Sequence, residues 1–252
     1  MSKDPHQSRF ARQLPLGEAF GALQRQYIIG GYIMPLNPAS YPAKSGLVNE
    51  LLEGQLVQLF GKLVSPVEIT CILGSDDKSA EMAAFLIHVC GLSDNLKLTL
   101  LAPGEDAAMD ETLDASLLPA TAVGSPRMVF HGVPGGKEIT AFASAILTAG
   151  GASKPLDKFT MKDIAKIKKP LRLQICVSLA CAHCCQLVTA AQRIAWENEL
   201  VTAHMIDANL YPALVERQNI QRVPLTIING RDQFPGGKTM AELTTILAKY
   251  KA

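Results

Sequence analysis

Two cysteines spaced C-x-x-C, Cys181 and Cys184, are the residues of this sequence best suited to chemistry. Residues 171–179 before them alternate apolar and polar side chains, as a half-covered strand does, and helical spacing begins at Gln186. We therefore expect the pair where a strand turns into a helix, with Cys181 in the first helical turn. Free N–H groups and the helix dipole there stabilise a thiolate by up to about 2 kcal/mol.

A thiolate at Cys181 attacks a partner disulfide, and Cys184, one turn along, resolves the mixed disulfide. His183 lies between them and either tunes the pair when protonated or is a solvated bystander. The same cysteines are also half of a zinc site that Cys185 and His183 would complete, or they are inert buried thiols. Because no second C-x-x-C or C-x-x-H occurs elsewhere, the redox pair is favoured and no metal is expected.

Length and composition limit the classes of function. The 252 residues are 48% apolar with a formal net charge of +1, which indicates a globular protein and gives no reason to expect nucleic acid or membrane partners. The apolar segment 27–36 is too short to span a bilayer. Without a basic and apolar leader, a reducing cytoplasm fits the six cysteines best, with Cys71, Cys90 and Cys176 as small buried residues.

The remaining elements follow from periodicity and breaker residues. Residues 1–44 predict an irregular extension with a short helix over 17–27, and residues 152–169 a lysine-rich linker. In the first half the pattern predicts helices over 45–63, capped by Ser45, 79–91 and 137–148, and strands over 67–73, 96–101 and 127–132. Residues 104–122 predict an acidic connection with one short helix. In the second half the pattern predicts strands ending at 179 and over 201–206 and 225–229, and helices over 181–198, 211–218 and 238–250.

The two halves repeat one another in residues as well as in order. Aligning 67–69 with 173–175 places Ser75 on Cys181 and Lys78 on Cys184. Residues 125–132 then match 223–230, and the Gly-Gly-Lys of 135–137 matches that of 236–238. We expect a half without C-x-x-C over 45–151 and a half with it over 170–252.

A strand, a C-x-x-C helix and a later X-Pro strand together resemble the thioredoxin fold. Val223-Pro224 resembles the cis-proline turn of that fold, where the preceding backbone pairs with an incoming peptide. The alternative is an ordinary trans proline that opens a strand.

Residues 47–250 are similar to the N-terminal region of the alkyl hydroperoxide reductase flavoprotein subunit, a tandem of thioredoxin-like folds whose second member alone bears C-x-x-C. The chain also resembles the protein disulfide oxidoreductases, which usually keep both motifs. The matching residues are 66–68, 78–81, 92–94, 178–184 and Val223-Pro224.

The resemblance implies roles for further residues. An acidic residue of the silent half lies beside the disulfide in that family and falls here on Glu138, which would exchange a proton with Cys184. The alternative is that Glu138 only stabilises the N-terminus of its helix. Ala182 and His183, with the Val-Pro turn, would contact the substrate.

The resemblance also implies partners. The chain ends at residue 252 and contains no G-x-G-x-x-G, so we expect no cofactor and electrons from a thiol pool or a separate thioredoxin-reductase-like flavoprotein. The expected substrate is a protein disulfide such as that of a peroxiredoxin.

The sequence thus predicts an α/β protein of two tandem thioredoxin/glutaredoxin-like folds packed as one unit, acting as a cytoplasmic thiol–disulfide oxidoreductase. A non-catalytic thioredoxin-like binding module remains an alternative. So does a metal or iron–sulfur carrier that uses Cys181, Cys184 and Cys185.

Overall fold

The computed structural model describes residues 28–29, 32–33 and 36–250, and the chain divides into two compact units. In the first unit, residues 1–34, the short strands β1 (Ile28–Ile29) and β2 (Tyr32–Ile33) pair antiparallel. The helix expected over 17–27 lies outside the described residues. The second unit, residues 35–252, holds the remaining elements.

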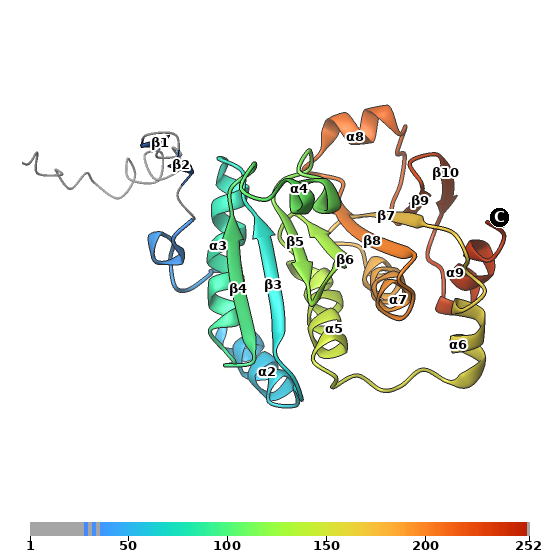
Figure 1. Ribbon diagram of the computed structural model, residues 1–252, viewed down its shortest axis with the longest axis horizontal. Helices are drawn as coiled ribbons and strands as arrows, with labels where there is room; N and C mark the ends of the chain where they lie inside the picture. Colours follow the sequence, from blue (N-terminus) through green and yellow to red (C-terminus); the bar gives the residue numbers. More distant parts are fainter. Residues whose placement is uncertain (1–27, 30–31, 34–35, 251–252) are drawn as a thin grey trace, which may run out of the picture. The chain divides into compact units, whose positions relative to one another are not determined.

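A single eight-stranded sheet runs through the second unit (Figure 1), in the order β10-β9-β7-β8-β6-β5-β3-β4. In each half, the first strand pairs in parallel with the second and antiparallel with the third, and the fourth pairs antiparallel with the third. The strands are β3 (Val67–Ile72), β4 (Leu96–Leu101), β5 (Ala120–Val123), β6 (Ser125–His131), β7 (Leu171–Val177), β8 (Val201–Asp207), β9 (Leu225–Ile228) and β10 (Asp232–Pro235).

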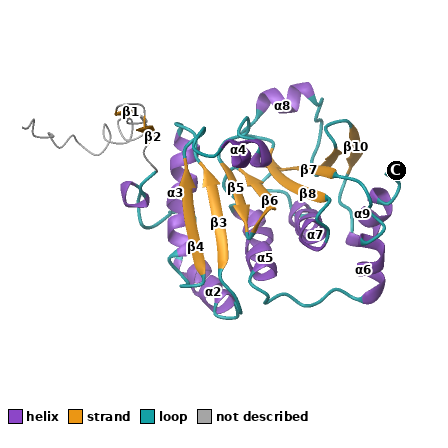
Figure 2. Ribbon diagram, in the orientation of Figure 1, coloured by secondary structure: helices purple, strands orange, loops and turns teal. Residues whose placement is uncertain are grey.

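Helices cover both faces of the sheet unequally, as Figure 2 shows by colour. The largest apolar cluster joins the strands to α2, α3, α5, α6, α7 and α9, and two smaller clusters join the other face to α4 and α8. The helices are η1 (Pro38–Ser40), α2 (Glu50–Phe60), α3 (Asp77–Cys90), α4 (Ala107–Leu113), η2 (Gly136–Glu138), α5 (Ile139–Ala149), α6 (Lys158–Ile164), α7 (Cys184–Glu197), α8 (Pro212–Arg217) and α9 (Met240–Leu247).

The two halves meet where β6 pairs in parallel with β8 and α5 packs on α7. Side chains bridge this boundary, since Arg127 Nε donates to the carbonyl of Ala195 at 3.0 Å and Gln192 Nε2 to that of Val129 at 3.0 Å. The prediction of two thioredoxin-like folds packed as one unit is confirmed. Because β6 and β8 run in the same direction, the carboxyl ends of the central strands in both halves lie along one edge of the sheet.

A buried histidine pair also lies on this boundary. His131 of β6 and His204 of β8 stack with ring centroids 5.2 Å apart, and the Nε2 and Nδ1 atoms between them are 2.9 Å apart. The Leu117 carbonyl, 2.7 Å from His131 Nδ1, can only accept, so His131 Nδ1 donates to it and His204 donates to His131. Burial lowers the pKa of His131 to about 4 and that of His204 well below its usual value. Both rings are therefore neutral at pH 7.

Helix α2 begins later than predicted. Its N-cap is Asn49, whose side chain accepts the amide of Leu52 at 2.9 Å, and it ends at Phe60 rather than at residue 63. The expected cap, Ser45, is buried in the segment before the helix instead. The leucine spacing continues through this segment, which is why periodicity alone placed the helix start too early.

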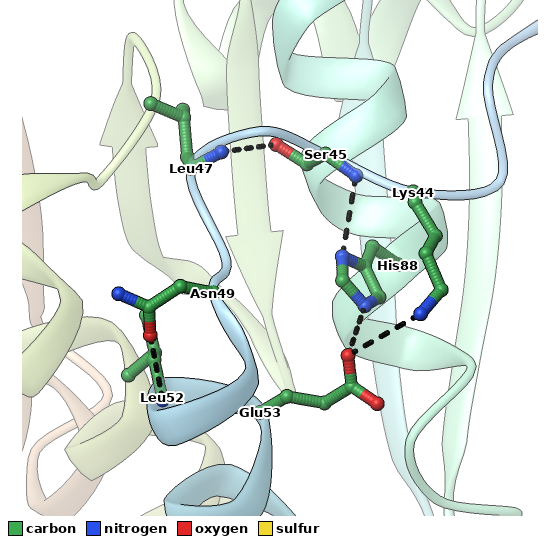
Figure 3. A network of polar contacts seen from close by, with 7 residues as sticks. All are labelled: Lys44, Ser45, Leu47, Asn49, Leu52, Glu53 and His88. Carbon is green, nitrogen blue, oxygen red and sulfur yellow. Dashed lines mark hydrogen bonds and ion pairs between the residues drawn. The ribbon is translucent and has the colours of Figure 1, made fainter.

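Ser45 belongs to a polar network that fastens this segment to α3 (Figure 3). The Ser45 amide donates to Nδ1 of His88 at 3.2 Å, so the opposite nitrogen carries the proton and donates to Oε2 of Glu53 at 3.1 Å. Lys44 Nζ lies 3.8 Å from the same carboxylate oxygen. The buried imidazole thus has partners on both sides, one from the segment and one from α2.

Three further expectations need correction. The segment 152–169, expected as a linker, contains α6. The segment 104–122, expected as a connection with one short helix, contains that helix as α4 but also most of β5. The expected match of 125–132 with 223–230 is wrong, because the cis peptide before β5 is Leu118-Pro119, at the place of Val223-Pro224 before β9. The strand register also differs from the expected alignment of 67–69 with 173–175. Ile72 opposes Ala120, the residue after the first cis-proline, as Cys176 opposes Leu225 after the second, so Ile72 corresponds to Cys176.

Candidate active site

The C-x-x-C pair lies in and after the loop that joins β7 to α7. Cys181 and Cys184 form a disulfide with their Cα atoms 5.5 Å apart. The helix starts at Cys184, not at Cys181 as the sequence suggested, and the Cys181 amide donates to the Ser178 carbonyl at 2.8 Å within the preceding turn. Cys184 therefore occupies the first helical turn, while Cys181 stands before it.

Exposure distinguishes the two cysteines. Cys181 is partly exposed, whereas Cys184 is completely buried in the core. An incoming sulfur reaches Cys181 from solvent, but it reaches Cys184 only through Cys181. The arrangement suits an outer nucleophile and an inner resolving thiol.

The cis peptide expected at Val223-Pro224 is present. The Pro224 carbonyl accepts the amide of Gly236 at 2.9 Å, which ties the turn to the loop before α9. Within residues 36–250, neither the backbone N–H nor the C=O of Val223 makes a hydrogen bond. An extended peptide segment would find a free donor and a free acceptor there.

The corresponding turn of the silent half is occupied. The carbonyl of Leu118, the residue before its cis-proline, accepts the hydroxyl of Tyr211 at 3.1 Å, and Tyr211 comes from the other half. Asp76, near the position matched to the cysteines, accepts the Ser79 amide at 2.7 Å and caps α3. The first half thus lacks both the thiols and a free carbonyl before the cis-proline.

Glu138 comes from the silent half and is brought to the loop that carries the disulfide. The Lys137 amide donates to the carbonyl of Leu179 at 3.1 Å, and η2 packs against α7. Gly136 makes this approach possible: its φ is 55°, and a Cβ there would lie 2.6 Å from the Leu179 oxygen. Gly136 and Lys137 therefore lie against Leu179, two residues before Cys181.

The Glu138 carboxyl is completely buried, and neither oxygen has a hydrogen-bond partner among the described residues. Its side chain makes no capping hydrogen bond to α5. Burial raises its pKa from 4.5 to about 7, with a smaller contribution from the charge of Asp207. Such a carboxyl exchanges a proton near neutral pH.

Ala182 and His183 are exposed on the outer side of the loop. The His183 side chain makes no hydrogen bond to any residue between 36 and 250, which favours the bystander role over tuning of the pair. His183 does border a pocket of about 860 Å³ between α5, α7 and α9. That pocket, which the sequence did not indicate, is also lined by Pro224, Cys185, Thr140, Ser144 and Lys238.

The other thiols fall into two groups. Cys71, Cys90 and Cys176 are buried, as predicted, and burial raises the pKa of each to about 12, so they are poor nucleophiles. Cys185 is free and partly exposed on the pocket wall, not fully buried.

Sequence reasoning missed Asp207, which ends β8 beside the disulfide loop. It is 4% exposed and pairs with Val177 of β7, and its Oδ1 accepts the backbone and side-chain N–H groups of Asn209 at 3.1 and 3.2 Å. A signal was present, because an aspartate that ends an apolar strand marks the edge where parallel strands present polar side chains.

No helix within the described residues is long and apolar enough to cross a membrane. No group of three or more histidine, cysteine, aspartate or glutamate side chains in this part of the chain is arranged to hold a metal ion.

The sequence is similar to that of known proteins. A family model described as a thioredoxin domain matches residues 171–248. The F subunit of alkyl hydroperoxide reductase in Pseudomonas aeruginosa is 32% identical over 199 residues, which are 79% of this chain and 36% of that protein. The chain thus spans little more than a third of the length of the curated relatives it matches.

Solved structures match over the same span. The NTD_N/C domain of the alkylhydroperoxide reductase AhpF from Enterococcus faecalis covers 79% of this chain and 99% of its own, at 30% identity and a TM-score of 0.74. A protein disulfide oxidoreductase from Aeropyrum pernix covers 80% of this chain and 92% of its own with a TM-score of 0.73. At 19% identity, the second match shows a shared fold.

Proposed function

Because the chain belongs to the family of the NTD_N/C domain of the alkylhydroperoxide reductase AhpF, we propose that it is a thiol–disulfide oxidoreductase. The observation that carries this proposal is the contrast between an accessible Cys181 and a buried Cys184 within one disulfide. The redox unit is the half over 170–252, supported by the half over 45–151.

The reaction proceeds through two exchanges. The Cys181 thiolate attacks a partner disulfide, a bond forms between Cys181 and one partner sulfur, and the other leaves as a thiolate. Cys184 then loses its proton and attacks the Cys181 sulfur, so the Cys181–Cys184 disulfide forms and the second partner thiolate leaves. Two electrons pass to the partner, and a donor restores the dithiol.

The neighbouring residues have distinct roles in this scheme. The free backbone of Val223, beside Pro224, pairs with the extended segment that carries the partner disulfide, while the exposed Ala182 and His183 contact its surface. The buried carboxylate of Glu138 accepts the Cys184 proton before resolution and returns it on reduction.

A peroxiredoxin disulfide is the proposed partner, by analogy with relatives named for hydroperoxide reduction. We propose a thioredoxin-reductase-like flavoprotein or a thiol pool as donor, no bound cofactor and a cytoplasmic location.

An equilibrium titration in thiol–disulfide buffers, with alkylation and mass mapping of each cysteine, tests the pair directly. We expect Cys181 and Cys184 to interconvert as one two-electron couple. A potential near about −270 mV would indicate a reductant, and one above about −200 mV an oxidant. A pair that never forms a disulfide in these buffers would refute the function.

Variants then assign the roles. With a peroxiredoxin disulfide as substrate, Cys181→Ser should lose turnover, and Cys184→Ser should accumulate a mixed disulfide. Cys185→Ser is the matched control and should retain turnover. Turnover in the Cys181→Ser protein would contradict the mechanism, and equal retention of the partner by a Cys181→Ser, Cys184→Ser protein would indicate a binding module instead.

A further inference from the structure

Asp207 ends β8 at the sheet edge that carries the disulfide loop. It lies opposite Val177, the last residue of β7, and the amide of Ala208 donates to the Val177 carbonyl at 2.9 Å. Asn209, bound to the Asp207 carboxylate, also reaches Ser178 Oγ at 3.4 Å. Asp207 and its turn are therefore fixed against the start of the loop that leads to Cys181.

The silent half approaches Asp207 from the opposite side. β6 runs parallel to β8, and a Cβ on Gly132, just beyond β6, would lie 3.5 Å from the Asp207 Cβ. The chain continues from Gly132 to Glu138, which is buried and whose pKa is raised by burial and, to a smaller extent, by the charge of Asp207. Each half thus contributes one buried carboxyl to the same edge of the sheet.

Few other charges face these carboxyls. Asp207 interacts with Lys78 of α3, whose ammonium is hydrogen-bonded to Glu81 at 2.6 Å, and with the polar groups of Asn209. Burial, and then the charges of Asp76 and Asp207, raise the pKa of Tyr211. The Tyr211 hydroxyl donates to the Leu118 carbonyl of the silent half. Helix α7, which begins at the buried Cys184, packs against η2, which contains Glu138. No described cation forms an ion pair with Glu138.

We propose that Asp207 is a positioning residue for proton transfer, in which its carboxylate and Glu138 form a coupled pair that holds one proton while the Cys181–Cys184 disulfide is formed. The proposal rests on the proposed function. While the disulfide is formed, the two interacting buried carboxyls do not both carry a charge, so the hydrogen-bonded Asp207 keeps the negative charge and Glu138 holds the proton. In the reduced protein that proton is on Cys184, and Glu138 is a carboxylate. Burial raises the pKa values of both carboxyls, in agreement with this arrangement.

The pair makes Glu138 a stronger base when the mixed disulfide is resolved. The Cys184 S–H proton passes to Glu138, the new thiolate attacks Cys181, and the bond between Cys181 and the partner breaks as the partner thiolate leaves. When the disulfide is reduced again, Glu138 returns the proton to the Cys184 sulfur. Asp207 is neither protonated nor consumed in the cycle, and it raises the affinity of Glu138 for the proton.

Asp207→Asn separates this role from a structural one. The amide oxygen still accepts the Asn209 N–H groups, so the turn after β8 is kept while the charge is lost. A purely structural Asp207 would leave the pH profile of the reaction unchanged. Asp94→Asn, at an exposed aspartate, is the matched control for the loss of one negative charge.

The test is a single-turnover reaction of the full, reduced chain with an aromatic disulfide that releases one coloured thiolate in each exchange. The rate of the second release is measured from about pH 5 to about pH 9. We expect Asp207→Asn to move the acidic limb of the profile down by roughly 0.5 to 1 pH unit. Asp94→Asn should not move the limb.

Because Asp207 acts through Glu138, Asp207→Asn should have no further effect in a Glu138→Gln background. An unchanged limb in Asp207→Asn, or an equal shift without Glu138, would overturn the inference. Redox titration of the parent and of Asp207→Asn separates failure of the proposed function from failure of this inference. A missing Cys181–Cys184 disulfide in the parent refutes the function, and a normal couple in both proteins with an unmoved limb refutes only the role of Asp207.

Discussion

Replacement of the buried Glu138 by glutamine should change how the stability of the protein depends on pH. The pKa of this carboxyl is raised from 4.5 to about 7, chiefly by burial. Between these values the unfolded chain has released the proton while the folded protein retains it. The free energy of unfolding of the parent should therefore fall as the pH rises from 4.5 to about 7.

The size of the effect follows from the same interval. At about 1.36 kcal/mol per pH unit, the rise to a pKa of about 7 corresponds to roughly 3 kcal/mol of stability lost above pH 7. Glutamine has a similar shape and no charge to bury, so Glu138→Gln should escape this loss. The variant should match the parent near pH 4 and exceed it by up to roughly 3 kcal/mol near pH 8.

Urea denaturation of the oxidised proteins at a series of pH values measures this difference. Glu68→Gln, on the exposed side of β3, controls for removal of a solvated carboxylate and should show no comparable trend. A difference between Glu138→Gln and the parent that stays constant from about pH 4 to about pH 8 would show that Glu138 is not a buried, pH-dependent carboxyl.

Two further changes test the contacts that join the halves. Gly136→Ala should cost about 1 to 3 kcal/mol of unfolding free energy, because the new Cβ would lie 2.6 Å from the Leu179 oxygen and the residue would keep a positive φ. Gly237→Ala has room for its Cβ and is the control, and chemical denaturation of both variants measures the difference. His204→Phe removes the donor to His131 and should cost about 1 to 3 kcal/mol near neutral pH. The pKa values of both histidines are lowered, that of His131 to about 4, so the parent should lose stability as the pH falls from about 6.5 toward 4. The variant lacks the contribution of His204, so denaturation in that pH range should show a shallower loss of stability. Equal slopes would contradict the account of the histidine pair.

The order of elements was largely predictable because apolar periodicity reflects burial, and burial is decided by the sheet. The redox pair was predictable because thiol chemistry requires a specific spacing, and the buried Cys71 and Cys176 followed from composition. Helix starts were less predictable: the leucine pattern continued through Ser45, but the hydrogen bonds of His88 decide the path of that segment.

The features that depend on long-range pairing were the hardest to predict. The match of 125–132 with 223–230 relied on a shared proline, while strand register shows that Pro119 occupies the place of Pro224. Asp207 belongs to the site only because β8 lies between β7 and β6, an order that local sequence does not reveal. The role of Glu138 came from a family resemblance rather than from its immediate sequence.

The parallel pairing of β6 with β8 limits how this protein can be divided by an engineer. A thioredoxin-domain model matches residues 171–248, which suggests that the redox half, about residues 170–252, could be used as an independent domain. Cutting it out would expose the backbone edge of β8 and the apolar side of α7 that α5 covers, both of which favour aggregation. It would also discard Glu138. A transplant intended to move this chemistry into another protein must therefore carry both halves, even though only one of them contains the cysteines that react.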